Sequence, residues 1–259
     1  MSIETVNPAT GEVRTTDLVE SDAATVASVC RRAAEIFASG PPSRAERAAF
    51  LRAAADAFEE QREAVVATAA AETALPAAGR LEGELTRVCH QLRLFAEVVE
   101  EGSYLEATID HAGSTPMGPR PDLRRLLIPT GPVGIFGASN FPLAFSVPGG
   151  DTVAALAAGC PVVVKAHAAH PLTSELCADL MRAAAAACGL EPDLLQVVHG
   201  FSAGQRLVQD ERITAVSFTG SLQGGRALMA LIADRRDPIP FYGELSGLNP
   251  AVVTPSAAR

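Results

Sequence analysis

The sequence predicts an α/β protein built on a doubly wound parallel sheet. Two observations carry this prediction: five short apolar runs rich in β-branched residues follow residue 128, and helical stretches rich in Ala, Leu and Arg separate them. The runs span residues 133–136, 161–164, 194–198, 214–218 and 239–242, and the clearest helical stretches span 172–188 and 221–233. Strands that alternate with helices form βαβ units, in which helices cover both faces of a parallel sheet.

The segment before the sheet is predicted to form a short hairpin and then a layer of helices. Residues 3–16 carry Asn-Pro-Ala-Thr-Gly at a turn, and residues 21–102 keep a helical pattern. Ser43 and Glu46 form a capping box, in which each side chain accepts from a free backbone N–H at the start of a helix. Residues 1–102 are therefore assigned to an N-terminal hairpin and helical layer.

The middle and the end of the chain have different patterns. Residues 103–128 contain two glycines and three prolines among irregularly alternating residues, which predicts two extended arms around a mobile tip. Residues 129–250 hold the sheet. The apolar run at 251–253 is expected to begin another strand, so residues 251–259 are assigned to the start of a further domain.

Composition excludes several classes of function. The chain of 259 residues is 48% hydrophobic and 20% charged, with a net charge of -9 and a pI of about 5.1, so a nucleic-acid partner is not expected. Five cysteines without a CxxC pair, and no secretory segment near Met1, indicate a reducing, cytoplasmic setting. Residues 126–150 lack charged side chains, but four prolines and five glycines prevent a membrane-spanning helix.

Two polar side chains follow apolar strands. Asn140 stands at the end of a Gly-rich turn, where it either forms a plain Asx turn or donates its amide to a developing oxyanion. Lys165 ends the Val-Val-Val run, where an ammonium either binds a ribose or phosphate or simply reaches solvent. His167 and His170 are three residues apart, but no third ligand has a suitable spacing, so no metal is expected.

Two further segments offer chemistry. Phe218-Thr-Gly220-Ser221, with Gly225 beyond it, has the glycine spacing of a strand that turns into a helix, whose free N–H groups could hold a pyrophosphate. Without a ligand, the same residues are a glycine-cornered helix start. Glu244 follows an apolar run, and it is either a desolvated general base or a solvated surface carboxylate.

The order and spacing of these four segments resemble the cofactor-binding domain of the aldehyde dehydrogenase superfamily over essentially the whole chain. The resemblance implies a Rossmann-like NAD(P) fold, an arm that pairs subunits in a homo-oligomer, and an aldehyde as substrate. It matches Asn140 to the oxyanion donor, Lys165 to the ligand of the adenosine ribose and Glu244 to the general base. The remaining cofactor-binding positions that it implies are Phe218, Gly220, Ser221 and Gly225.

More narrowly, the segments FGASNFPLAFSVPGGDT, VVVKAHAAHP and IPFYGELSGLNP resemble the α-ketoglutaric semialdehyde (2,5-dioxovalerate) dehydrogenase group. One position departs from the NAD-preferring pattern of the superfamily, in which a glutamate follows the lysine by three residues. This chain has Ala168 there, which removes repulsion against a 2′-phosphate. The expected cofactor is therefore NADP, with NAD possible.

In this superfamily the nucleophilic cysteine lies a few tens of residues beyond the segment of Glu244, whereas this sequence ends at Arg259. The resemblance therefore implies that the C-terminal catalytic domain is missing and that the chain alone is inactive. A non-catalytic nucleotide-binding or subunit-pairing protein is the alternative. A CoA-acylating relative is a third hypothesis, but Glu244 counts against it, because no water is activated when a thiol accepts the acyl group.

Overall fold

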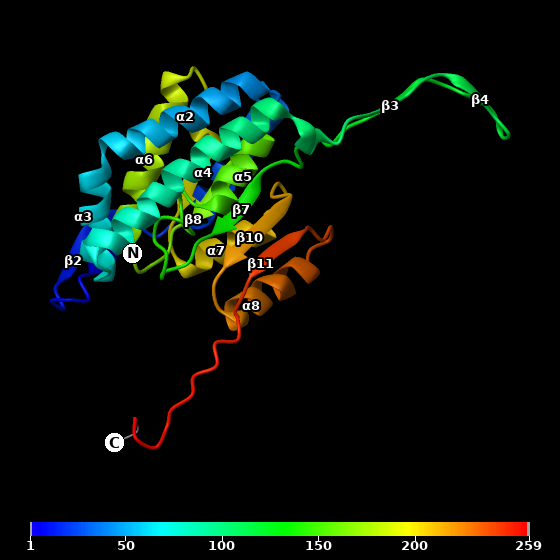
Figure 1. Ribbon diagram of the computed structural model, residues 1–259. Helices are drawn as coiled ribbons and strands as arrows, with labels where there is room; N and C mark the ends of the chain where they lie inside the picture. Colours follow the sequence, from blue (N-terminus) through cyan, green and yellow to red (C-terminus); the bar gives the residue numbers. More distant parts are fainter. Residues whose placement is uncertain (1, 258–259) are drawn as a thin grey trace.

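The computed structural model describes residues 2–257, which form a parallel sheet covered by helices, with one long arm (Figure 1). The chain begins with an antiparallel hairpin of β1 (Ser2–Val6) and β2 (Val13–Val19), as predicted. The helical layer that follows contains α1 (Ala23–Ala38), α2 (Arg44–Glu60), α3 (Arg62–Thr73) and α4 (Glu82–Glu101). The capping box at the start of α2 is confirmed, because Ser43 and Glu46 make both of its hydrogen bonds.

The central sheet confirms the predicted fold class. Its five strands are all parallel and lie in the order β11-β10-β7-β8-β9. They are β7 (Val133–Phe136), β8 (Val162–Lys165), β9 (Leu195–Val198), β10 (Ala215–Thr219) and β11 (Phe241–Glu244). The chain builds the sheet outward from β7 to β8 and β9 and then crosses to β10 and β11. The strand order therefore reverses between β7 and β10, where a crevice opens at the carboxyl ends of the strands.

Helices bury both faces of this sheet. The crossover helices are α5 (Gly150–Ala158), α6 (Pro171–Ala187), α7 (Phe201–Gln209) and α8 (Leu222–Ala233). Val162 and Val164 of β8 pack into one core with α2, α4, α5 and α6, whereas Val163 packs into a second core with α1, α7 and α8. Because successive side chains of a strand point to opposite faces, a continuous apolar run is what a strand between two helical layers requires.

Residues 103–128 form the predicted extended arm, which projects far from the body of the molecule (Figure 1). After a 3₁₀ turn at Ser103–Leu105, β3 (Thr108–Asp110) pairs with β6 (Leu123–Arg125), and β4 (Gly113–Thr115) pairs with β5 (Gly118–Arg120). Nearly all side chains of these strands are exposed. Two strands alone cannot bury a core, so the arm extends into solvent.

Two expectations about the end of the chain need correction. The run at 251–253 forms no strand and pairs with none of the strands in residues 2–257, and Val252 and Val253 are 90% and 67% exposed. The last sheet strand spans Phe241–Glu244 rather than 239–242, which makes Glu244 its final residue. No helix within residues 2–257 is long and apolar enough to cross a membrane.

Candidate functional site

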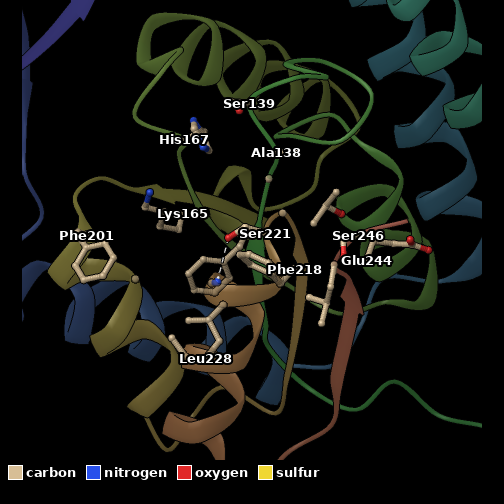
Figure 2. A pocket seen from close by; sticks show the side chains of 18 of the residues that line it. Ala138, Ser139, Lys165, His167, Phe201, Phe218, Ser221, Leu228, Glu244 and Ser246 are labelled. Carbon is tan, nitrogen blue, oxygen red and sulfur yellow. Dashed lines mark hydrogen bonds between the residues drawn. The ribbon is translucent and has the colours of Figure 1, made fainter. Parts of the chain in front are cut away.

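A cavity of about 1100 Å³ opens at the carboxyl edge of the sheet, where the strand order reverses. Its wall comes from the turn after β7, the ends of β8, β10 and β11, and the facing sides of α7 and α8 (Figure 2). The volume suits a large organic ligand. Among the predicted site residues, the wall includes Asn140, Lys165, Phe218, Gly220, Ser221 and Glu244.

Lys165 is the last residue of β8, and its side chain forms part of the cavity wall. Burial lowers the pKa of its ammonium group. Gly204 of α7 packs closely here, because an added Cβ there would lie 3.0 Å from Phe136 Cε1 and 3.4 Å from Lys165 Cγ. Within residues 2–257 the ammonium has no ion-pair partner. A half-buried cation without a counterion, at the carboxyl edge of a parallel sheet, favours the interpretation of Lys165 as an anion or hydroxyl ligand.

The start of α8 lies against the ring of Phe218. Ser221 caps the helix, since its Oγ accepts the N–H of Gly224 at 3.1 Å. An added Cβ at Gly220 or Gly224 would approach Phe218 Cζ to 2.6 Å or 2.9 Å, so glycines are required for this close contact. The N–H groups of Leu222 and Gln223 have no acceptor within the described part of the chain. Free N–H groups at a helix start can bind an anion.

Gly225, which was expected beside the phosphates, does not form part of the cavity wall. It is buried, and an added Cβ there would clash with the side chain of Leu245. The neighbouring Gly224 faces the cavity in its place. In this structure Gly225 therefore allows α8 to pack against the segment that follows β11.

Asn140 lies on the turn after β7, and its side chain is exposed to the cavity. The plain Asx turn is not formed, because residue 142 is a proline and has no N–H to donate to Oδ1 of the Asn140 side chain. The turn itself is held tightly: an added Cβ at Gly137 would lie 2.7 Å from Ser146 Cα. The Asn140 amide is therefore positioned at the cavity without a partner among residues 2–257.

The helical layer braces this turn through a buried carboxylate. Glu84 of α4 accepts the N–H groups of Leu143 and Ala144, both at 2.8 Å. Arg80 binds the second Glu84 oxygen and the carbonyl of Asn140, each at 2.7 Å. Sequence analysis missed both residues, because an acid and an arginine four positions apart on a helix give no signal beyond an ordinary surface pair.

Glu244 stands on the opposite side of the cavity from Lys165 (Figure 2). Its carbonyl accepts the N–H of Gly220 at 3.0 Å, which ties the end of β11 to the start of α8. The carboxylate is exposed, so residues 2–257 do not supply the desolvation that the general-base hypothesis requires. Its distance from Lys165 across the cavity separates the two charges rather than pairing them.

The rings of His167 and His170 stack with centroids 5.4 Å apart, and His170 is buried between the carbonyl of Ala138 and the hydroxyl of Ser174. His167 forms part of the cavity wall, which sequence analysis also missed. Residues 2–257 contain no group of three or more His, Cys, Asp or Glu side chains placed to hold a metal ion.

No cysteine among residues 2–257 contributes to the cavity wall. Cys30, Cys89, Cys160 and Cys177 are buried, and Cys188 is half-buried. Burial raises the pKa of Cys30 and of Cys89 to about 12, and it raises the pKa of Cys177 as well. Such thiols are protonated and unreactive at neutral pH.

The sequence model of the aldehyde dehydrogenase family matches residues 1–259. The chain therefore belongs to the aldehyde dehydrogenase family. It is 52% identical over 217 residues to the α-ketoglutaric semialdehyde dehydrogenase 2 of Azospirillum brasilense. The matched region covers 82% of this chain and 41% of that protein. The α-ketoglutaric semialdehyde dehydrogenase of Acinetobacter baylyi is 48% identical over 214 residues, covering 82% of this chain and 40% of that protein.

Among solved structures, the NAD⁺ complex of an aldehyde dehydrogenase from Bacillus cereus superposes with a TM-score of 0.80 at 26% identity. The superposition covers 98% of this chain and 50% of that one. This chain thus spans about two fifths of the length of the two curated relatives and half of the solved chain.

Proposed function

We propose that this chain is the NAD(P)-binding part of an aldehyde dehydrogenase that oxidises an acid semialdehyde, such as α-ketoglutaric semialdehyde, to a carboxylate. The observation that carries the proposal is the cavity at the strand-order reversal, where Asn140, Lys165, the start of α8 and Glu244 meet. The similarity to two α-ketoglutaric semialdehyde dehydrogenases supports the substrate class.

The residues of the cavity fit a dinucleotide. Lys165 would bind the adenosine ribose or a phosphate on it, and the free N–H groups at the start of α8 would bind the pyrophosphate, with Ser221 and Gly220 beside them. Gly224 and Phe218 shape the wall below. When bound, the nicotinamide accepts a hydride.

The other end of the cavity would serve the aldehyde. The Asn140 amide would donate to the oxygen that becomes negatively charged, and the Glu84–Arg80 brace would keep that amide in place. Glu244 would take a proton from the water that releases the acid. For this role Glu244 needs to be covered, which residues 2–257 do not do.

The proposed cofactor is NADP, with NAD bound less well or equally. Glu244 is the only acidic side chain in the wall among the described residues, and it lies across the cavity from Lys165. Ala168, near Lys165, adds no negative charge. Calorimetric titration with both cofactors tests this. A preference for NAD⁺ of tenfold or more, about 1.4 kcal/mol, would contradict it.

We further propose that this polypeptide alone has no turnover, because no thiol reaches the cavity in residues 2–257 and a covalent acyl intermediate needs one. Purified protein with α-ketoglutaric semialdehyde and NADP⁺ should form no NADPH, whereas a full-length relative should. Turnover that is abolished by Cys160→Ala or Cys89→Ala would reveal an unsuspected nucleophile. Turnover that survives every cysteine substitution would refute the covalent mechanism.

The exposed arm supports a homo-oligomer as the assembled form, because two-stranded ribbons of this kind gain stability only by packing on another surface. The same feature suits the alternative of a non-catalytic subunit-pairing protein. Binding of NADP⁺ by the purified chain would favour the dehydrogenase, and association without nucleotide binding would favour the alternative. The five free thiols support a cytoplasmic location.

A further inference from the structure

His167 is a polar residue of the cavity wall that has no role in the aldehyde chemistry proposed for Asn140 and Glu244. It lies two residues beyond Lys165, on the same side of the cavity and across from Glu244 (Figure 2). Both side chains are half-buried. Together they form a polar corner at the carboxyl end of β8, and Ala168 adds no charge to it.

The hydrogen bonding of His167 fixes which ring nitrogen carries the proton. Nδ1 accepts the backbone N–H of Ala169 at 3.1 Å. A nitrogen that accepts a hydrogen bond has no proton of its own, so the neutral imidazole carries its proton on Nε2. Within residues 2–257 no protein group pairs with Nε2. The cavity wall therefore offers an N–H donor.

The ring is also held in a fixed orientation. It stacks on His170 with an interplanar angle of 24° and centroids 5.4 Å apart. His170 in turn is anchored in the core by Ala138 and Ser174. A donor that is already oriented loses little freedom when it binds a ligand.

The charges around this corner are positive or neutral. Burial, His170 and Lys165 together lower the pKa of His167 to about 4. The acids Glu72 and Glu84 act on His170 rather than on His167. At neutral pH the corner thus holds one ammonium and one neutral N–H donor. A dianion placed between them would favour the imidazolium form, because an opposite charge within a few ångströms stabilises the charged form of a base.

We propose that His167 is the specificity-determining residue for a phosphate monoester on the adenosine ribose, and that it takes up a proton when this phosphate binds beside Lys165. The inference rests on the proposed function, in that a dinucleotide occupies the cavity. It assigns the preference for the 2′-phosphorylated cofactor to a positive contact, in addition to the absence of an acid at Ala168.

The test is calorimetric titration of the purified chain with adenosine 2′,5′-bisphosphate and with 5′-AMP, which differ only in the 2′-phosphate. His167→Ala should weaken binding of the bisphosphate by tenfold or more and that of 5′-AMP by less than twofold. His167→Gln should restore much of the bisphosphate affinity, because its amide can donate from a similar position. His90→Ala, a change at an exposed histidine of α4, is the matched control and should alter neither ligand.

Proton uptake distinguishes a direct contact from a general loss of structure. Titrations of the bisphosphate in two buffers with different ionisation enthalpies, at pH 6.5 and 8, report the protons that are bound. The wild type should take up more protons than His167→Gln, and its bisphosphate affinity should rise more steeply as the pH falls.

Equal losses for the two ligands in His167→Ala, or equal proton uptake in the wild type and His167→Gln, would overturn the inference while leaving the proposed function intact. Failure of the wild type to bind either adenosine nucleotide would refute the proposed function and the inference with it.

Discussion

Glu84 is expected to be the most sensitive position in the brace behind the Asn140 turn. Its side chain is 1% exposed, one oxygen accepts two backbone N–H groups at 2.8 Å, and the other pairs with Arg80 at 2.7 Å. Hydrogen bonds to a charged group contribute about 1.5–3 kcal/mol each, and a buried donor left unpaired costs about 1–3 kcal/mol. Glu84→Ala should therefore lower the free energy of unfolding by about 3–5 kcal/mol.

Glu84→Gln should have a smaller effect, about 1–3 kcal/mol, because its carbonyl oxygen can still accept both N–H groups while its NH₂ faces the donors of Arg80. The matched control is Glu35→Gln. Glu35 belongs to another Arg–Glu pair four residues apart on a helix, but the Arg31 and Glu35 side chains are 58% and 56% exposed and 3.6 Å apart. Removal of that pair should cost at most about 0.5 kcal/mol.

The assay is urea denaturation followed by far-ultraviolet circular dichroism, since the chain contains no tryptophan. Amide hydrogen exchange gives a local readout: the N–H groups of Leu143 and Ala144 should be protected in the wild type and exchange faster in Glu84→Ala. Equal destabilisation in the Glu84 and Glu35 variants, or unchanged exchange at the two amides, would refute the reasoning.

Two further predictions concern stability. Burial opposes ionisation of Glu175, but the hydrogen bond from His199 and nearby positive charge lower its pKa below 4.5. Ionised Glu175 should thus stabilise the fold fully above pH 4.5, and this contribution should be lost as the pH falls through the lowered pKa. In a plot of the urea midpoint against pH, Glu175→Gln should therefore show a smaller decrease at acidic pH than the wild type. An unchanged decrease would contradict this. Gly137→Ala should destabilise the fold by about 1–3 kcal/mol, because the added Cβ would clash with Ser146. In the same denaturation assay the control Gly83→Ala, in open space on α4, should be neutral or stabilising. Equal effects of the two substitutions would contradict the steric argument.

The sheet was predictable because its strands are buried on both faces. Val162, Val163 and Val164 alternate between two cores, so no polar residue interrupts the run and the strand is visible in the sequence. The same argument placed Lys165 at the carboxyl end of β8, because the first charged residue after such a run lies where the buried part of the strand ends.

Other features depend on contacts that the sequence does not display. The Glu84 carboxylate meets its amide partners 59 and 60 residues later in the chain, and nothing near Glu84 indicates them. Gly224 and Gly225 are adjacent, and which of them faces the cavity depends on the rotation of α8, which is set by the packing of Leu245. Ala251–Val253 has the composition of a strand, but a strand needs a partner and composition cannot supply one.

The position of Asn140 therefore depends on the helical layer as much as on the sheet. The turn after β7 leaves the sheet at the point of strand-order reversal, but its amides are held by Glu84 and its carbonyl by Arg80, both within or next to α4. α4 also shares a continuous apolar core with β7 and β8. A change that loosens α4 should thus displace the proposed oxyanion donor without touching Lys165 or the start of α8. This would separate loss of the chemical step from loss of cofactor binding in a full-length enzyme.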